Sequence, residues 1–294
     1  MKNFILQPSS LPVRQAGFNL DLILMNALSE DIGHCDVTTS AVIPPGHKSK
    51  AVLIAKDEFI LAGISFAGRV FSLLDAGIKF NADKKDGRRV KKGDVIARVS
   101  GSTADLLKAE RTALNLLQRL SGIATLTHKF VECVKGLHVK ITDTRKTAPN
   151  LRFFEKYAVR AGGGHNHRFG LFDGVLIKDN HIAAAGGITK AVRLARSKTH
   201  HIMKIEVEAK NIKEVKQALS AGADIIMLDN MPVKEMKNAV KVIRRQNPSI
   251  LIEASGSVTL QNVRQIAETG VDMISSGTVT HSAPAVDISM KVLD

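Results

Sequence analysis

The hydrophobic pattern of the chain changes about one third of the way along. Before residue 103, short apolar runs alternate with polar turns, as in mixed α/β folds. These runs predict four strands, at 51–56, 59–63, 78–82 and 95–101. An amphipathic helix is expected at 20–29, and the longest helix at 103–131, where leucines recur near helical spacing. A domain boundary is expected around this long helix, in which Gly122 marks either a break or a close contact.

After residue 137 the pattern becomes a repeat of apolar strand, loop and helix. Six strands are predicted, at 138–142, 174–179, 203–208, 223–229, 250–255 and 271–277. Helices are predicted after three of them, at 211–222, 232–246 and 258–270. Strands joined by crossover helices form a parallel sheet. Because no strand leads into a GxGxxG turn with an acidic residue downstream, the repeat favours a βα barrel over a dinucleotide-binding sheet.

The residues that close these strands are polar or charged. In chain order they are Lys178, Glu208, Asp229, Ser255 and Ser276, and the last four follow one another at steps of 21, 26 and 21 residues. In a βα barrel the carboxyl ends of the strands meet on one face, where function collects. Five such residues in succession predict a shared functional rim rather than ordinary solvation of strand ends.

Glu208 and Asp229 place two carboxylates at this rim. Carboxylate oxygens are the ligands that Mg²⁺ prefers, and they also stabilise a cationic transition state. The alternative is that each carboxylate forms an ion pair with a neighbouring lysine.

Small residues follow two consecutive strands near the end of the repeat. One loop contains Ser255, Gly256 and Ser257, and the next contains Ser276, Gly277 and Thr278. Small side chains let backbone N–H groups approach an anion, and a helix that follows would add its positive N-terminal end. Two such loops in consecutive βα units predict a phosphate site, although each loop alone also fits an ordinary turn.

The segment 142–181 holds the densest group of charged and glycine residues. It carries Arg145, Lys146, Arg168 and Lys178, together with three consecutive glycines at 162–164. Arginine suits two-pronged contacts with carboxylate or phosphate, so these cations are expected to converge on a dianion.

Two other interpretations of this segment stay open. His165 and His167 would contribute to a zinc site, but neither a cysteine cluster nor an HExxH motif accompanies them. Lys178 would form a Schiff base if it were a buried barrel lysine. Its neighbouring cations weigh against this, because they need to stay charged for an anionic ligand.

Composition narrows the class of ligand. The chain has 294 residues, with 42 Lys plus Arg against 28 Asp plus Glu and a formal charge of +14. A basic protein can bind nucleic acid, an anionic membrane or small anions. With no Trp and one Tyr the chain is poorly equipped to stack bases, although its 11 Phe keep stacking open. Small anions are therefore favoured, with a solvated basic surface as the alternative for many of these residues.

The chain also bears on where the protein resides. No stretch is apolar for the roughly 18 residues that a membrane helix needs. Residues 1–17 lack a signal-peptide pattern, and Cys35 and Cys133 stand in no metal or redox spacing. We therefore expect a cytoplasmic protein in a reducing compartment.

Several motifs, in order along nearly the whole chain, resemble those of the quinolinate phosphoribosyltransferases, a family of type II phosphoribosyltransferases. They are EDIGHCDVTT (30–39), AERTALNLLQRLSGIAT (109–125), the segment from TRKT to LIKDNH (144–181), IEVEAKN (205–211), IMLDNM (226–231), IEASGS (252–257) and SSGTVTHSAPAVDISM (275–290). The resemblance implies an α/β fold with two domains. An N-terminal α+β sandwich over 1–115, completed by a C-terminal tail at about 280–294, would precede an open α/β barrel with parallel strands over 116–279.

The resemblance further implies transfer of phosphoribosyl from phosphoribosyl pyrophosphate to the ring nitrogen of quinolinate, followed by loss of CO₂. The products would be nicotinate mononucleotide and pyrophosphate, as a step of de novo NAD biosynthesis. Mg²⁺ would accompany the pyrophosphate, and no organic cofactor would be required. Homodimers with shared active sites, in some members assembled into hexamers, are implied as well.

Substrate-binding roles are implied for Arg111, Thr144, Arg145, Lys146, His167, Arg168, Lys178, Glu208 and Asp229. Of these, Lys146, Lys178, Glu208 and Asp229 would be catalytic. Arg145, His167 and Arg168 would hold the quinolinate carboxylates, and Arg111 would reach the same pocket across the dimer. Glu208 and Asp229 would face the ribose and the metal. The loops 255–257 and 276–278 would bind the 5′-phosphate.

Three positions depart from the family pattern. Ser257 stands where a second glycine is common, which leaves the backbone contacts to phosphate open there. Asn150 replaces a usual glycine, although asparagine tolerates a left-handed turn. Cys35 also stands at a frequent glycine position and is expected to be a small buried residue.

Two competing functions remain. One is a relative of the same fold that does not decarboxylate its product, such as the pyrophosphorylase-like proteins associated with molybdate transport. The pairs Arg145–Lys146 and His167–Arg168 favour a dicarboxylate instead. The other is a non-catalytic protein that binds anions or nucleic acid. Glu208 and Asp229 weigh against it, because they would repel a polyanion that brings no metal.

Overall fold

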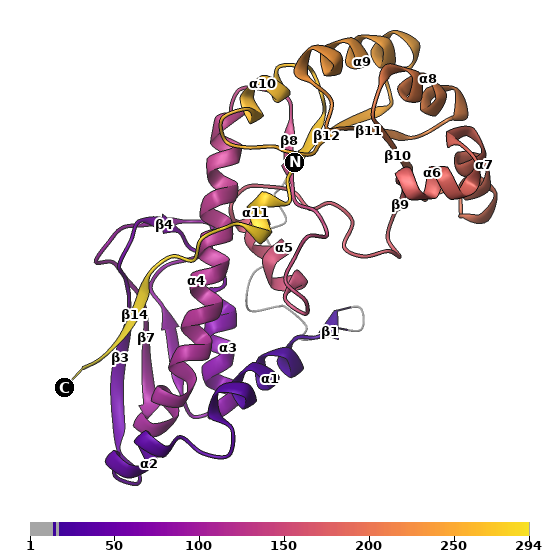
Figure 1. Cartoon of the computed structure of the whole chain (residues 1–294). Coiled ribbons are helices and arrows are strands. Elements are labelled where there is room, and N and C mark those ends of the chain that lie inside the picture. The colour runs from indigo at the N-terminus through magenta and orange to yellow at the C-terminus, as the bar shows by residue number, and fades with distance from the viewer. Residues whose placement is uncertain (1–13, 16–17, 294) are drawn as a thin grey trace. The chain divides into compact units, whose positions relative to one another are not determined.

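The computed structural model describes residues 14–15 and 18–293, which divide into two compact units (Figure 1). The first unit contains the chain up to Thr125 and the returning segment from Pro284 onward, and the second contains Leu126–Ala283. The division falls within the long helix α4 (Thr103–Cys133), later in that helix than the predicted boundary after residue 115. The expectation that residues 1–17 carry no signal peptide lies outside the described residues, apart from 14–15.

An antiparallel sheet forms the framework of the first unit. Its strands lie in the order β14 (Ile288–Leu293), β3 (Lys48–Ala55), β7 (Val95–Ser102) and β5 (Lys79–Ala82). Two short pairs accompany it, β1 (Arg14–Gln15) with β2 (Phe18–Asn19) and β4 (Phe59–Ile60) with β6 (Arg89–Val90). The four predicted strands are confirmed, although the run at 59–63 forms only a two-residue strand.

The helices of the first unit begin at side-chain caps where the sequence provides them. They are α1 (Leu20–Ile32), α2 (Val37–Val42), α3 (Ile64–Leu74) and the first part of α4. The side chain of Asn19 accepts the Leu22 N–H at the start of α1, and Asp36 accepts the Thr39 N–H at the start of α2. α3 was not predicted, and it buries Val70 and Phe71.

α4 runs without a break through Gly122. A Cβ at this position would lie 2.0 Å from the backbone oxygen of Pro284, so only glycine lets the returning segment pass this close. Gln118 binds that segment at two points. Its backbone carbonyl oxygen accepts the Val286 N–H, and its side chain donates to the backbone carbonyl oxygen of Ile288. Gly122 therefore marks a close contact.

The prediction that Cys35 is buried is wrong. Cys35 lies in the turn between α1 and α2, and its free thiol is exposed. Asp36 must reach the first turn of α2 as its cap, so the connection stays at the surface, as most short connections do. Asn150 does adopt the left-handed conformation, with a φ of 63°.

Six parallel strands form the curved sheet of the second unit, with helices along its outer side (Figure 1). Their order is β8 (Lys140–Thr142), β13 (Met273–Ser275), β12 (Leu251–Ser255), β11 (Ile225–Asp229), β10 (Ile205–Ala209) and β9 (Val175–Ile177). An isolated parallel bridge between Thr142 and His165 extends the sheet beyond β8. The predicted parallel α/β architecture and its six strands are confirmed.

Seven helices of the second unit follow α4: α5 (Arg152–Ala161), α6 (Asp179–Ala185), α7 (Ile188–Lys198), α8 (Ile212–Ala221), α9 (Val233–Gln246), α10 (Val263–Ala267) and α11 (Thr278–His281). α8 and α9 confirm the prediction. The helix expected over 258–270 is reduced to α10, because Thr259 and Asn262 form a turn in which the Asn262 side chain accepts the Thr259 N–H and donates to the Ser257 oxygen. Within the described residues, no helix is both long enough and apolar enough to cross a bilayer.

Alternation along the parallel strands places the site. Val207, Leu228 and Ala254 are fully buried, and each faces away from the residues before and after it in its strand. The intervening positions, such as Glu208 and Ser255, line the interior at the carboxyl ends of the strands. A packed outer face therefore fixes the positions of the polar inner face.

Candidate active site

A pocket of about 550 Å³ opens at the carboxyl ends of the strands of the second unit. The five strand-end residues predicted to share a rim all line it: Lys178, Glu208, Asp229, Ser255 and Ser276. Nine further predicted residues line it too: Thr144, Arg145, Lys146, His167, Arg168, Gly256, Ser257, Gly277 and Thr278. The strand-end residues thus share one pocket, as their spacing along the chain predicts.

Arg111 is the predicted site residue that stands apart from this group. It lies on α4 in the first unit and is exposed. Its expected role is contact with the pocket of a partner subunit.

Two arginine side chains in the pocket carry buried N–H groups that have no partner among the described residues, at Nε of Arg145 and Nε of Arg168. Nη1 of Arg168 donates to the carbonyl oxygen of Gly174 at 2.8 Å, which orients the guanidinium. Burial and then the charge of Arg145 lower the pKa of Arg168. Crowded cations with unused donors suit an anion that carries two charges.

The two lysines occupy different places around the pocket. Lys146 lies against the second loop, since a Cβ on Gly277 would come 2.8 Å from its Cδ. Lys178 precedes α6, and it is exposed. The Schiff-base alternative required a buried lysine, so the exposure of Lys178 does not support it.

Glu208 and Asp229 are half-buried neighbours on β10 and β11. Burial, together with the charge of Asp229, raises the pKa of Glu208, while Lys178 opposes the shift. Asp229 accepts a hydrogen bond from the side chain of Asn230 at 3.0 Å. Among the residues the structure describes, neither carboxylate forms an ion pair with a lysine, so both stay available to a ligand.

The first predicted phosphate loop has an unusual backbone. Gly256 has a φ of 93°, and a Cβ there would lie 2.2 Å from Oδ1 of Asn230. Ser257 also has a positive φ, of 36°, and its hydroxyl donates to Oδ1 of Asn230 at 3.2 Å. Serine thus takes a left-handed turn where the family commonly has glycine. The expected helix dipole is missing from this loop, because α10 begins only at Val263.

A buried network beneath the pocket holds the segment that carries Arg168. Nζ of Lys156 lies 2.6 Å from Oδ1 of Asp143, and these side chains are only 5% and 0% exposed. Asp143 also accepts hydrogen bonds from the Asn166 side chain and the His167 backbone N–H, at 2.7 and 2.8 Å. Because every donor points into one carboxylate, the backbone from 166 to 168 is fixed.

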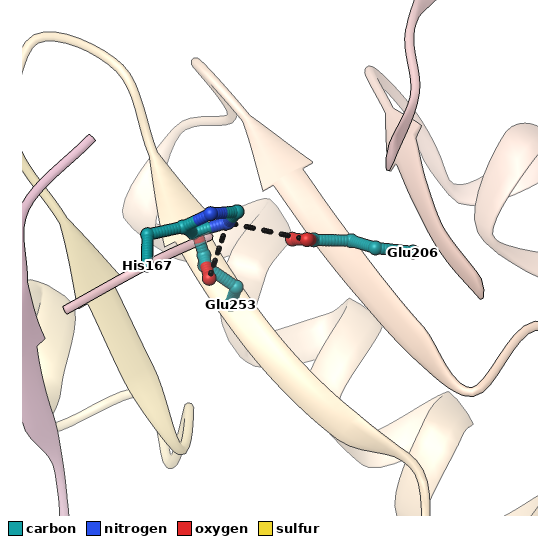
Figure 2. A group of neighbouring side chains, drawn as sticks. All are labelled: His167, Glu206 and Glu253. Carbon is teal, nitrogen blue, oxygen red and sulfur yellow. Dashed lines mark ion pairs between the residues drawn. The ribbon is translucent and has the colours of Figure 1, made fainter. Parts of the chain in front are cut away.

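Sequence reasoning missed Glu206 and Glu253, which form a cluster with His167 (Figure 2). Nε2 of His167 lies 3.2 Å from Oε2 of Glu206 and 3.6 Å from Oε2 of Glu253. The two glutamates stand two residues before Glu208 and Ser255, so each faces the same interior as its strand-end neighbour. This two-residue spacing along each strand is the sequence signal that could have located both glutamates.

The three side chains bring their ligand atoms within 4.8 Å of one another, close enough to surround a metal ion. However, the backbone N–H of Arg168 donates to Nδ1 of His167 at 2.8 Å. Nδ1 therefore carries the lone pair and Nε2 the proton, which turns Nε2 into a donor rather than a metal ligand. His165 contacts Arg160 instead, at 3.1 Å, so the zinc alternative gains no support.

Comparison with known families agrees with this geometry. Sequence models of the N-terminal and C-terminal domains of quinolinate phosphoribosyl transferase match residues 36–121 and 123–291. The chain belongs to the quinolinate phosphoribosyl transferase family. The predicted resemblance is thereby confirmed over most of the chain.

The reported relatives within the quinolinate phosphoribosyl transferase family are similar over more than nine tenths of their length. A probable nicotinate-nucleotide pyrophosphorylase (carboxylating) of Bacillus subtilis is 47% identical over 93% of each chain. The corresponding Synechocystis protein is 43% identical over all of this chain and 99% of its own. The crystal structure of NadC from Streptococcus pyogenes matches with a TM-score of 0.89 at 42% identity, over 96% of this chain and all of that one.

Proposed function

We propose that this pocket transfers phosphoribosyl from phosphoribosyl pyrophosphate to the ring nitrogen of quinolinate and then releases CO₂, a step of NAD biosynthesis. The observation that carries the proposal is the pair of buried, unpartnered Nε–H groups of Arg145 and Arg168, in a pocket that also holds Glu208 and Asp229. Unpaired guanidinium donors suit a dicarboxylate, and nearby carboxylates suit the positive charge that develops on the ribose. The names of the relatives describe the same reaction.

The quinolinate carboxylates would bind Arg145 and Arg168, with Lys146, Lys178 and Thr144 around them. His167 lines the pocket, but its two ring nitrogens are engaged by Arg168 and by the glutamates. A direct contact from the imidazole to a substrate carboxylate would replace one of these bonds. We therefore give His167 a positioning role as well as its predicted binding role.

Glu208 and Asp229 would face the ribose and the Mg²⁺ that accompanies pyrophosphate. Their oxygens are of the type that Mg²⁺ prefers. Burial and then the like charge of Asp229 raise the pKa of Glu208, and a bound cation would oppose this shift. When bound, Mg²⁺ would neutralise charge on the leaving pyrophosphate. The carboxylates themselves would stabilise the oxocarbenium-like ribose as its bond to pyrophosphate lengthens.

The 5′-phosphate would bind the loops 255–257 and 276–278. Gly256 supports this, because its conformation and its contact with Asn230 exclude a side chain beside the pocket. Gly277 supports it through its close approach to the Lys146 side chain. Transfer leaves a positive charge on the pyridine nitrogen, which stabilises the electron pair left on the adjacent ring carbon when CO₂ departs, so no organic cofactor is needed.

We also propose a homodimer, or a hexamer built from dimers, in which Arg111 enters the partner's pocket. Mixing Arg111→Ala with Lys178→Ala subunits tests this arrangement. Random exchange would restore about a quarter of the sites, since half the dimers are hybrids with one intact site each. No recovery after demonstrated exchange would remove Arg111 from a shared site.

A cytoplasmic location is part of the proposal. It is supported by the free thiols of Cys35 and Cys133, which suit a reducing compartment. Fractionation of cells that make the protein tests it.

A product assay with quinolinate and nicotinate side by side tests the main proposal. We expect Mg²⁺-dependent release of pyrophosphate and CO₂ in equal amounts from quinolinate and no reaction with nicotinate. Pyrophosphate without CO₂ would indicate a relative that does not decarboxylate. Neither product from pure, folded protein would overturn the assignment.

A further inference from the structure

We propose that Glu253 is the acid that protonates the ring carbon from which CO₂ departs, and that Glu206 and His167 keep it in its acid form. This inference rests on the proposed function, because it concerns the second half of that reaction. It arises from Glu206 and Glu253 in Figure 2, which the binding roles above leave without a chemical task.

Glu253 has the position that such an acid needs. It lies in the middle of β12, is 1% exposed and still lines the pocket. Ser255 begins the first phosphate loop two residues further along the same strand, so Glu253 lies one layer deeper on the same face. If the 5′-phosphate binds the loops 255–257 and 276–278, the pyridine ring would extend toward the bottom of the pocket, where Glu253 lies.

The environment of Glu253 favours a proton on its carboxyl group. Its Oε1 atom is buried and accepts no hydrogen bond from the part of the chain that the structure describes, and an ionised oxygen in that condition is costly. Four groups face it: Glu206 from β10, His167, Ser275 from β13, and Asp143 after β8. Burial and the charge of Glu206 raise the pKa of Glu253 to about 7, with His167 and Ser275 opposing.

The hydrogen bonds of His167 favour a neutral imidazole, so that the additional proton of the cluster lies on Glu253. Burial lowers the pKa of His167, but the hydrogen bond to Glu206 and the charges of both glutamates raise it overall. A second ring proton would sit on Nδ1, where the Arg168 N–H already donates at 2.8 Å. The hydrogen-bond geometry therefore decides against the imidazolium, and the additional proton of the cluster resides on a carboxyl group.

The step balances as follows in atoms and charge. After transfer, the bond between ring carbon 2 and its carboxylate breaks, and the electron pair stays on carbon 2 beside the positive ring nitrogen. CO₂ leaves, and carbon 2 takes the proton of the Glu253 carboxyl group. Glu253 remains as a carboxylate and takes a proton from water once the product has gone. A neutral Glu253 also avoids repelling the dicarboxylate when it binds.

The test measures pyrophosphate and CO₂ in the same reaction. In Glu253→Gln we expect pyrophosphate to appear while CO₂ release falls at least ten-fold relative to it, and the N-ribosylated dicarboxylate accumulates. The matched control is Glu235→Gln, which changes an exposed carboxylate on α9 that does not line the pocket. This control should release both products in step.

The wild-type protein gives a second measurement that does not depend on a variant's folding. CO₂ release should fall behind pyrophosphate release as the pH rises above about 7, and in Glu206→Gln this lag should begin at a lower pH. A constant product ratio from pH 6 to 9, or Glu253→Gln releasing both products at the wild-type ratio, would overturn the role of Glu253. Absence of both products from the wild-type protein would instead overturn the proposed function.

Discussion

The two layers of polar side chains inside the barrel, one at the rim and one below it, differ in how far their carboxylates are buried and paired. At the rim, Glu208 and Asp229 are half-buried and lack lysine partners among the described residues, so a ligand can compete for them. One layer below, Glu206 and Glu253 are almost fully buried and engage His167 within the protein. The same residue type, two positions apart on β10, is therefore open to a ligand in one layer and engaged within the protein in the other. Depth, rather than residue type, separates the two environments.

The largest effect on the lower layer is expected from the removal of a buried carboxylate that supports it. Asp143→Ala leaves the ammonium group of Lys156 buried without its partner, which should cost about 3–5 kcal/mol of unfolding free energy. Denaturant titration measures it. The surface variant Glu132→Ala, which loses an exposed pair with Lys135, is the control and should cost under about 1 kcal/mol. Equal losses would mean that the buried pair contributes no more than a surface pair.

A rim substitution should show the reverse pattern, with activity lost and stability kept. Glu208→Gln removes a carboxylate from the developing ribose cation and should lower kcat by about 100- to 1,000-fold. Its melting temperature should stay within a few degrees of wild type, because the half-buried side chain forms no ion pair among the described residues. Glu235→Gln, exposed on α9, is the matched control. Full activity in Glu208→Gln would place the ribose elsewhere.

A smaller effect separates the two substrates at the rim. Arg145→Ala should weaken quinolinate binding by about ten- to a hundred-fold, as expected for the loss of a charged hydrogen bond. Phosphoribosyl pyrophosphate binding should change much less. Binding measured for each substrate alone decides this, with Arg245→Ala on α9 as the control. Equal losses for both substrates would move Arg145 out of the carboxylate site.

The rim could be predicted from the sequence because it obeys two local rules at once. Each βα unit ends its strand with a polar residue, and the repeat brings Lys178, Glu208, Asp229, Ser255 and Ser276 to one face. The lower layer obeys only the alternation of a strand. A glutamate inside an apolar run is commonly taken to face solvent. In a parallel barrel both faces are covered, so Glu253 points to the interior instead.

Other parts of the fold depend on partners that are distant in the chain. β14 forms because β3 offers it a free edge, and that pairing follows no local pattern in residues 288–293. α3 was missed because Val70 and Phe71 lie in an apolar run whose helical period is visible only once its buried face is known. Cys35 was placed in the core because it is small, whereas its position beside the cap of α2 keeps it outside.

The pairing of β14 with β3 also bears on how the protein is made. A ribosome releases Ile288–Leu293 long after Lys48–Ala55 has emerged. Until then β3 has an open edge, which is a site for unwanted association with other chains. The first unit is therefore begun first but completed last, and the whole second unit can form in the interval. The unit that is synthesised first is therefore completed after the second unit, and until then the open edge of β3 is exposed to aggregation in the nascent chain.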